Sequence, residues 1–214
     1  MHEIMERQAF MCPGCYAIYP VDILFQLNSH LDYSGSIILR NTSLYKYCPI
    51  CKRKKDHFLV DVEIAKIVRL FNLIGYKTIY SCEGHTHQIK NRKHTDYGKW
   101  RVGNIYVMIK GKKKLSKKLF KELVKNNFND FSIGQDESHK DVDIHKPEDV
   151  ECLLNSTTFS IHCNSYEWTH FTFDTQKEAE DYLAINRQNL LNVLTKYYND
   201  MRKRRNNNES YNGF

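Results

Sequence analysis

The stretch CPGCYAIYP, residues 12–20, decides how the first part of the chain folds, because it sets two cysteines one turn apart and follows them with a β-rich segment. A second pair, Cys48-Pro-Ile-Cys51, comes after 32 intervening residues. Two Cys-x-x-Cys turns supply the four thiolates of a closed tetrahedral zinc site. We therefore predict one structural Zn²⁺ ion, with Cys12, Cys15, Cys48 and Cys51 as its ligands.

The segment between the two cysteine pairs is longer than the spacing of about 15 to 20 residues that is usual in zinc ribbons. It contains SGSIILRNTSLYKY, residues 34–47, which is rich in β-branched and aromatic side chains. We expect a hairpin or small sheet there, within a zinc-ribbon-like module over residues 1–58. The alternative is that one pair is a thioredoxin-type dithiol, but two matched pairs around a β-rich segment favour zinc.

The remainder of the chain mixes helix and strand patterns, which predicts an α+β fold for the whole chain. We place a mixed α+β domain at residues 59–204 and a polar tail at residues 205–214. Strand patterns occur in NIYVMIK, residues 104–110, and in FSI, residues 131–133. TTFSIHC and WTHFTFD alternate in the same way and predict a hairpin.

Four helices are predicted from apolar spacing and capping residues. Asp61 is a suitable N-cap for a helix through Ile74. LSKKLFKELVKNN, from residue 115, is amphipathic, and Pro147 suits the first turn of a short helix through Leu154. Thr175 and Glu178 form a capping box for a long C-terminal helix that reaches about Arg204.

The motif YKTIYSCEGH, residues 76–85, predicts a strand from Tyr76 to Tyr80. The strand is followed by side chains that can bind a metal or transfer a proton. Because loops at strand ends often carry function, we expect these side chains at a rim of the domain. The motif is consistent with a ligand-binding turn in which Gly84 exposes backbone N–H groups to an anion. The residues of this turn are Cys82, Glu83, Gly84 and His85.

Three other interpretations of this motif remain open. Cys82, His85 and His87 could form a second metal site, completed by His94, His162 or Cys163. Glu83 or His85 could transfer protons, with Cys82 as a nucleophile. The turn could also be a structural loop that binds no ligand.

The following stretch, THQIKNRKHTDYGKWRVG, residues 86–103, is long and polar, and we expect a functional loop or a mobile lid. Trp100 could stack on a base while Lys99 and Arg101 meet phosphates. Anchoring of the loop on the core is the alternative role for this tryptophan. The ligand-binding residues predicted here are thus Lys99, Trp100 and Arg101.

Charge is distributed unevenly along the chain, whose net charge is +7. From Lys90 through Lys125, thirteen Lys and Arg residues stand against Asp96 and Glu122, a local net charge of +11. Residues 126–170 carry a local net charge of −7, from nine acidic residues against two lysines. The basic region would attract phosphates, although a lysine-rich helix face that serves only solubility has the same composition.

Composition excludes several classes of protein. With 214 residues, 41% of them hydrophobic and 27% charged, the chain fits a folded protein of one or two domains. It has no apolar run of membrane-spanning length, and MHEIMERQAF at its start lacks the pattern of a secretory signal. We therefore expect a cytoplasmic protein with no membrane partner, in which the seven cysteines are thiols or metal ligands.

Residues 61–85 resemble a group of uncharacterised proteins of phages and low-GC Gram-positive bacteria. In that group a zinc-knuckle segment precedes a Gly-Tyr-x-Thr strand, here Gly75 to Thr78, and a Cys-x-Gly-His turn, here Cys82 to His85. If the chain is phage-encoded, the resemblance implies a factor that acts in the host cytoplasm and interferes with host defence.

The same turn is distantly similar to the Ser-Ser-Cys-Ser-Gly-Arg turn of the wybutosine-synthesis methyltransferases, which act on tRNA with S-adenosylmethionine. That similarity covers about ten residues. Glu83 and His85 stand where that family has Ser and Arg.

Taken together, these features favour a zinc-stabilised binding protein that recognises nucleic acid or a phosphate-bearing ligand. The first alternative is an enzyme that modifies RNA or a nucleotide, with Glu83 or His85 as the acid-base group. The second alternative is an inhibitor or adaptor that engages another protein through its charged surfaces.

Overall fold

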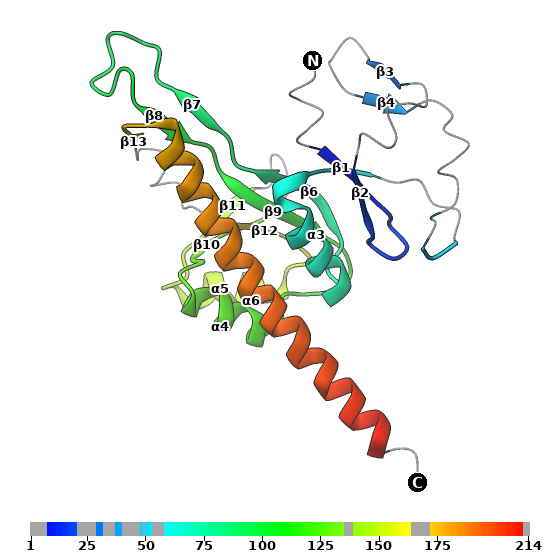
Figure 1. The fold of residues 1–214 in the computed structure, drawn as a ribbon. Coiled ribbons are helices and arrows are strands. Elements are labelled where there is room, and N and C mark those ends of the chain that lie inside the picture. The colour runs from blue at the N-terminus through cyan, green and yellow to red at the C-terminus, as the bar shows by residue number, and fades with distance from the viewer. Residues whose placement is uncertain are drawn as a thin grey trace. The chain divides into compact units, whose positions relative to one another are not determined.

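The structure, a computed structural model, describes residues 8–20, 29–31, 37–39, 48, 50–52, 58–134, 139–163 and 172–211 (Figure 1). The chain divides into two compact units, Met1–Arg69 and Leu70–Phe214, and the division falls within helix α3 (Val62–Ile74). The described part confirms the predicted α+β class, with a four-cysteine module in the first unit and a long C-terminal helix in the second.

The first unit is built of short antiparallel strands. Its three-stranded sheet has the order β2-β1-β5, formed by β1 (Gln8–Met11), β2 (Ile18–Pro20) and β5 (Phe58–Asp61). A separate pair, β3 (Ser29–Leu31) and β4 (Ile37–Leu39), lies between the two cysteine pairs in the sequence. The β-rich insertion that the sequence predicts is therefore present.

The second unit contains a five-stranded sheet with the order β11-β10-β12-β9-β6, in which all neighbours are antiparallel. Its strands are β6 (Thr78–Glu83), β9 (Ile105–Lys110), β10 (Asp130–Ile133), β11 (Lys140–Val142) and β12 (Thr158–His162). Side chains alternate between the two faces of a strand. In β9 the alternate residues Ile105, Val107 and Ile109 are all buried, so one face of the sheet forms the core.

Helices pack on this apolar face. The ring of Phe120, in α4 (Lys117–Lys125), lies 5.4 Å from the ring of Phe131. Tyr76, which follows α3, meets Phe159 edge to face at 6.0 Å. The remaining helices are α5 (Pro147–Asn155) and α6 (Gln176–Tyr211). None of the helices in the described part of the chain is long and apolar enough to cross a membrane.

Side-chain caps mark the starts of α4 and α6. Ser116 accepts a hydrogen bond from the Leu119 N–H at 3.1 Å and begins α4. The capping box at the start of α6 is confirmed, because the Glu178 N–H donates to Thr175 Oγ1 at 3.2 Å and the Thr175 N–H donates to Glu178 Oε2 at 3.1 Å. α6 continues to Tyr211, beyond the expected end near Arg204, because no Pro or Gly interrupts the polar segment before Gly213.

A second sheet in this unit shortens one predicted loop and corrects one predicted strand pairing. β7 (Thr86–Gln88) and β8 (Trp100–Val102) pair as a hairpin, and β13 (Thr172–Phe173) pairs with the other side of β8. Residues 86–88 and 100–102 are thus strands, and the long loop expected over residues 86–103 is confined to residues 89–99. The predicted pairing of TTFSIHC with WTHFTFD is wrong for the described residues, since β12 pairs with β9 and β10.

The strand that carries the YKTIYSCEGH motif is shifted relative to the prediction. β6 runs from Thr78 to Glu83, so Cys82 and Glu83 belong to the strand and only Gly84 and His85 follow it. Tyr76 was expected in the strand but lies two residues before it. Its side chain is completely buried, and its hydroxyl accepts a hydrogen bond from the Ser116 N–H at 3.0 Å. Core packing and this hydrogen bond therefore fix the tyrosine ahead of the strand.

Candidate metal centre and basic hairpin

The two cysteine pairs adopt the same backbone turn. The Tyr16 N–H donates to the Cys12 carbonyl at 2.8 Å, and the Lys52 N–H donates to the Cys48 carbonyl at 2.8 Å. The residue after each pair has a positive φ of 58°, at Tyr16 and at Lys52. Because L-residues seldom adopt this conformation, its repetition at both pairs indicates two equivalent knuckles that present their thiols in the same way.

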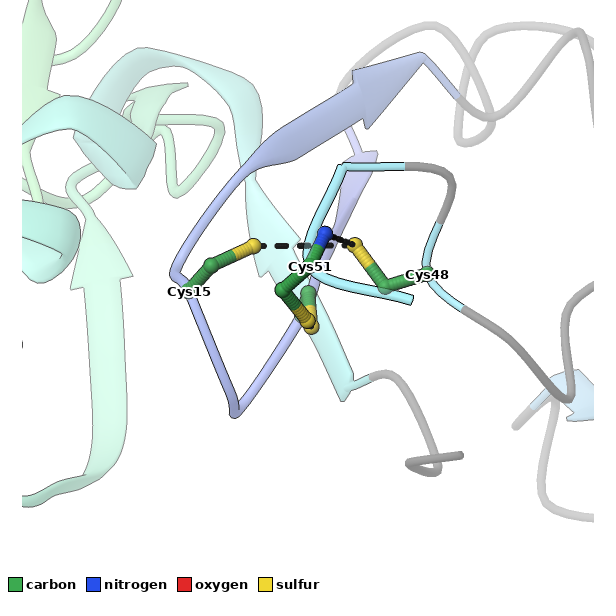
Figure 2. Close-up of side chains that lie close together, drawn as sticks. Cys15, Cys48 and Cys51 are labelled. Carbon is green, nitrogen blue, oxygen red and sulfur yellow. Dashed lines mark hydrogen bonds between the residues drawn. The ribbon is translucent and has the colours of Figure 1, made fainter. Parts of the chain in front are cut away.

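The four thiols converge on one point. The Sγ atoms of Cys12, Cys15, Cys48 and Cys51 all lie within 4.8 Å of one another, and Figure 2 shows the sulfurs of three of them side by side. The Sγ atoms of Cys12 and Cys51 are 3.9 Å apart, and those of Cys15 and Cys48 are 3.5 Å apart. A tetrahedral site with Zn–S bonds of about 2.3 Å has sulfurs about 3.8 Å apart. These distances fit one zinc ion and exceed the S–S bond of about 2.05 Å in a disulfide.

The surroundings of the thiols suit thiolate ligands. Backbone N–H groups of Gly14 and Cys51 donate to the sulfurs of Cys12 and Cys48, at 3.3 and 3.5 Å. Burial, followed by contacts with the other thiols, raises the pKa of Cys15 to about 12, and burial also raises the pKa of Cys12. A bound dication replaces these protons and offsets part of the negative charge of the four thiolates. Four thiolates leave no open position for water, so the residues fit a structural zinc site.

The end of β6 is fixed inside the second unit. Gly84 has a φ of +77°, and a Cβ atom at this position would lie 2.8 Å from side-chain atoms of Ile105 and of Leu183. The Gly103 N–H donates to the His85 carbonyl at 2.6 Å. This glycine is needed where the chain turns against its own core, with β9 on one side and α6 on the other.

Glu83 and His85, the two proton-transfer candidates, lie in different environments. Glu83 is 3% exposed, and its carbonyl accepts a hydrogen bond from Arg187 Nη1 at 2.7 Å. His85 is exposed, and one of its ring nitrogens lies within 4.8 Å of Cys82 Sγ. Whether this turn binds a ligand, as the sequence predicts, stays a prediction.

Arg187 makes a structural contact that the sequence interpretation did not single out. It lies on the buried side of α6, in one stripe with Leu183, Leu190 and Leu194. Its guanidinium reaches across to the end of β6. The sequence contained a signal for this contact. The 3.6-residue period of the helix predicts an apolar side chain at position 187, and a cation there indicates a buried polar contact.

His162 is held inside the second unit. Asn104 Nδ2 donates to its Nδ1 at 2.7 Å, and its Nε2 lies 3.3 Å from Ser132 Oγ. Burial lowers the pKa of His162, so the ring is neutral at pH 7, while burial raises the pKa of the Cys163 thiol. Among the described residues, no group of ligand atoms joins either side chain to Cys82 and His85.

The basic hairpin, which we define as residues 86–102, has an ordered turn. The Ile89 N–H donates to the Lys99 carbonyl at 2.9 Å, and the Gly98 N–H donates to the Ile89 carbonyl at 3.0 Å. Figure 1 shows the hairpin extending past the start of α6. Its sequence contains five Lys and Arg residues and a single acidic residue, Asp96. The Asp96 carboxylate lies 3.5 Å from Lys99 Nζ, so this acid is already paired with a cation.

Three cations of the hairpin point to solvent, namely Lys90, Arg92 and Lys93, and Tyr97 nearby is 51% exposed. The predicted Lys99, Trp100 and Arg101 group is divided, because alternation along β8 directs Trp100 and Arg101 to opposite faces, while Lys99 precedes the strand. Arg101 Nη2 donates to His94 Nε2 at 2.8 Å. All three side chains are half-buried.

Comparison of the chain with protein-family models, curated proteins and solved structures gave no match.

Proposed function

We propose that the protein is a zinc-stabilised nucleic-acid-binding protein whose basic hairpin contacts the phosphate backbone. The observation that supports this most directly is the exposure of Lys90, Arg92 and Lys93 on one extended hairpin. A row of cations without competing carboxylates attracts phosphates and releases their counterions. A two-stranded ribbon is also narrow enough to follow a nucleic-acid groove.

The burial of Glu83 argues against one of the two proton-transfer candidates in the YKTIYSCEGH motif, whereas His85 is exposed. A catalytic carboxyl must reach its substrate, and Glu83 is 3% exposed. The rigid strand end instead supports the hairpin, which begins directly after His85. If the resemblance to phage proteins reflects descent, the nucleic acid would belong to the host or to its defence system.

The test is the affinity for fluorescently labelled 20-nucleotide oligonucleotides, single-stranded and duplex, measured by anisotropy between 50 and 300 mM salt. A triple variant with Lys90→Ala, Arg92→Ala and Lys93→Ala removes three potential phosphate contacts. On single strands it should reduce the slope of log affinity against log salt by roughly 2, because each contact contributes about 0.7.

A matched control removes the same charge elsewhere in the second unit. Lys117, Lys121 and Lys125 are exposed on one side of α4, so their triple Ala variant changes the net charge equally. The control should keep most of the affinity and slope. Equal losses of affinity in both variants would show that the hairpin cations contribute only through the net charge. Absence of binding by the wild type would refute the proposed function.

A further inference from the structure

The face of the five-stranded sheet opposite the apolar core carries aromatic side chains at its β6 edge. Tyr80 in β6 pairs with Met108 in β9, and Cys82 pairs with Tyr106, so all four side chains share this face. Tyr80 is 58% exposed, while Tyr106 and Met108 are half-buried. Diagonal positions on neighbouring strands are about 7 to 8 Å apart, so Tyr80 and Tyr106 lie within one ligand's reach.

Polar atoms without partners lie beside these rings. Tyr106 stacks on the His162 ring, with centroids 5.9 Å apart and an angle of 30° between the rings. Asn104, also beside His162, binds this ring through Nδ2, whereas Asn104 Oδ1 has no hydrogen-bond partner among the described residues. Whichever way the amide is turned, only one of its two polar atoms can meet the histidine.

Ser160 adds a second unsatisfied group. It pairs with Met108, is 1% exposed, and its Oγ also has no hydrogen-bond partner in the described part of the chain. A buried polar atom without a partner destabilises the fold, and a new hydrogen-bond partner removes this penalty. Ser160 is too deeply buried to meet a ligand, so the face combines the exposed ring of Tyr80 with the unsatisfied amide oxygen of the half-buried Asn104, as a site for a planar polar ligand does.

The same face is continuous with the basic hairpin along the chain. β6 leads into β7 through Gly84 and His85, and β8 leads into β9 through Gly103 and Asn104. The Gly103 N–H donates to the His85 carbonyl at 2.6 Å, which holds the two connections together. A strand of nucleic acid that runs along the hairpin toward β6 can thus bring bases farther along the strand to Tyr80 and Tyr106.

We infer that this face, the base platform of Tyr80, Tyr106 and Asn104, binds unpaired bases of a single-stranded nucleic acid. The inference rests on the proposed function and specifies its ligand. Bases in a duplex are stacked on one another, whereas unpaired bases can stack on tyrosine rings and offer their edges to an amide. The protein should therefore prefer single strands to duplexes.

The test uses Tyr80→Ala and Tyr80→Phe in the full-length, zinc-loaded protein, with labelled 20-nucleotide oligo-dT and a mixed-sequence duplex. Loss of one stacked base should weaken single-strand affinity roughly 5- to 150-fold. Tyr80→Phe keeps the ring and should stay within about threefold of wild type. The salt slope should not change in either variant, because no phosphate contact is removed.

Ile185→Ala serves as the control, since Ile185 is equally exposed, at 60%, on α6. Thermal unfolding of each variant separates loss of binding from loss of folding. Normal single-strand affinity in a folded Tyr80→Ala variant, together with loss in the hairpin variant, would overturn the base platform and leave the proposed function standing. Failure of the wild type to bind either oligonucleotide would overturn both.

Discussion

At the scale of single residues, Gly84 and Gly98 are a matched pair of glycines with different surroundings. Both have positive φ, +77° and +87°, but a Cβ on Gly84 would meet Ile105 and Leu183 at 2.8 Å, whereas nothing lies within 4 Å of Gly98. The two positions therefore separate backbone strain from overpacking.

We expect Gly98→Ala to lower the free energy of unfolding by about 1 to 2 kcal/mol, from left-handed backbone strain alone. Gly84→Ala adds overpacking worth about 1 to 3 kcal/mol and should be clearly more destabilising. Chemical denaturation monitored by circular dichroism measures both values. Equal effects would mean that the core around Gly84 adapts without strain.

His162 makes the stability of the second unit depend on pH. Burial lowers the pKa of its ring, although Asp130 and Asp141 oppose this effect and His139 adds to it. The folded state therefore binds fewer protons than the unfolded state. The contribution to stability is complete above the unfolded pKa of about 6.5 and is lost as the pH falls through the folded value.

We predict that the free energy of unfolding of the wild type falls below pH 6.5, with a slope of up to about 1.4 kcal/mol per pH unit from this group. His162→Gln keeps a polar side chain but cannot titrate, so its profile should be flatter between pH 7 and 5. The measurement is urea denaturation at each pH. Parallel profiles for the two proteins would assign the pH dependence to other groups.

At the scale of secondary-structure elements, the capping box of α6 is a separable contribution to stability. Thr175→Ala removes the hydroxyl that accepts from the Glu178 N–H. The expected loss is about 1 kcal/mol. Thr195→Ala is the control, because its hydroxyl donates to the Leu191 carbonyl within the helix and alanine has the higher helix propensity. A drop in thermal midpoint for Thr175→Ala alone would confirm the cap, whereas equal midpoints would contradict it.

Elements with local signals were predictable from the sequence. Capping residues and apolar spacing located the four described helices of the chain, and alternation located β9. The two short strands of the basic hairpin were missed because their polar residues carry no alternating apolar pattern. The pairing of β12 with β9 and β10 was missed because strand order depends on contacts between distant segments, which alternation within one strand does not specify.

Residues of the candidate sites were likewise predictable where their signal is local in the sequence, and not where it depends on distant residues. The four zinc ligands were predicted because two short, identical spacings are local in the sequence and chemically specific. Arg187 and His162 act through contacts with residues far away in the chain, Glu83 and Asn104. Sequence patterns reveal such residues only as polar side chains in apolar surroundings, without naming the partner.

At the scale of the whole molecule, the two units should differ in their dependence on metal. Before α3, the described part of the first unit buries few apolar side chains, and its four-cysteine site ties together two knuckles that are distant in sequence. Small zinc modules gain about 10 to 16 kcal/mol of apparent binding energy from the ion and commonly unfold without it. The second unit has its own apolar core around Phe71, Phe131 and Phe159, which contains no zinc ligand.

We predict that a strong chelator releases one zinc ion per chain and abolishes hydrogen-exchange protection of β1 and β2, while β9 and β12 remain protected. Cys48→Ser should have the same effect without chelator, and Cys152→Ser, at an exposed cysteine outside the site, should retain the ion. Mass spectrometry of intact protein and of exchanged peptides measures both quantities. Loss of protection in β9 and β12 on chelation would show that the second unit also depends on the ion, because its own core would then be insufficient for folding.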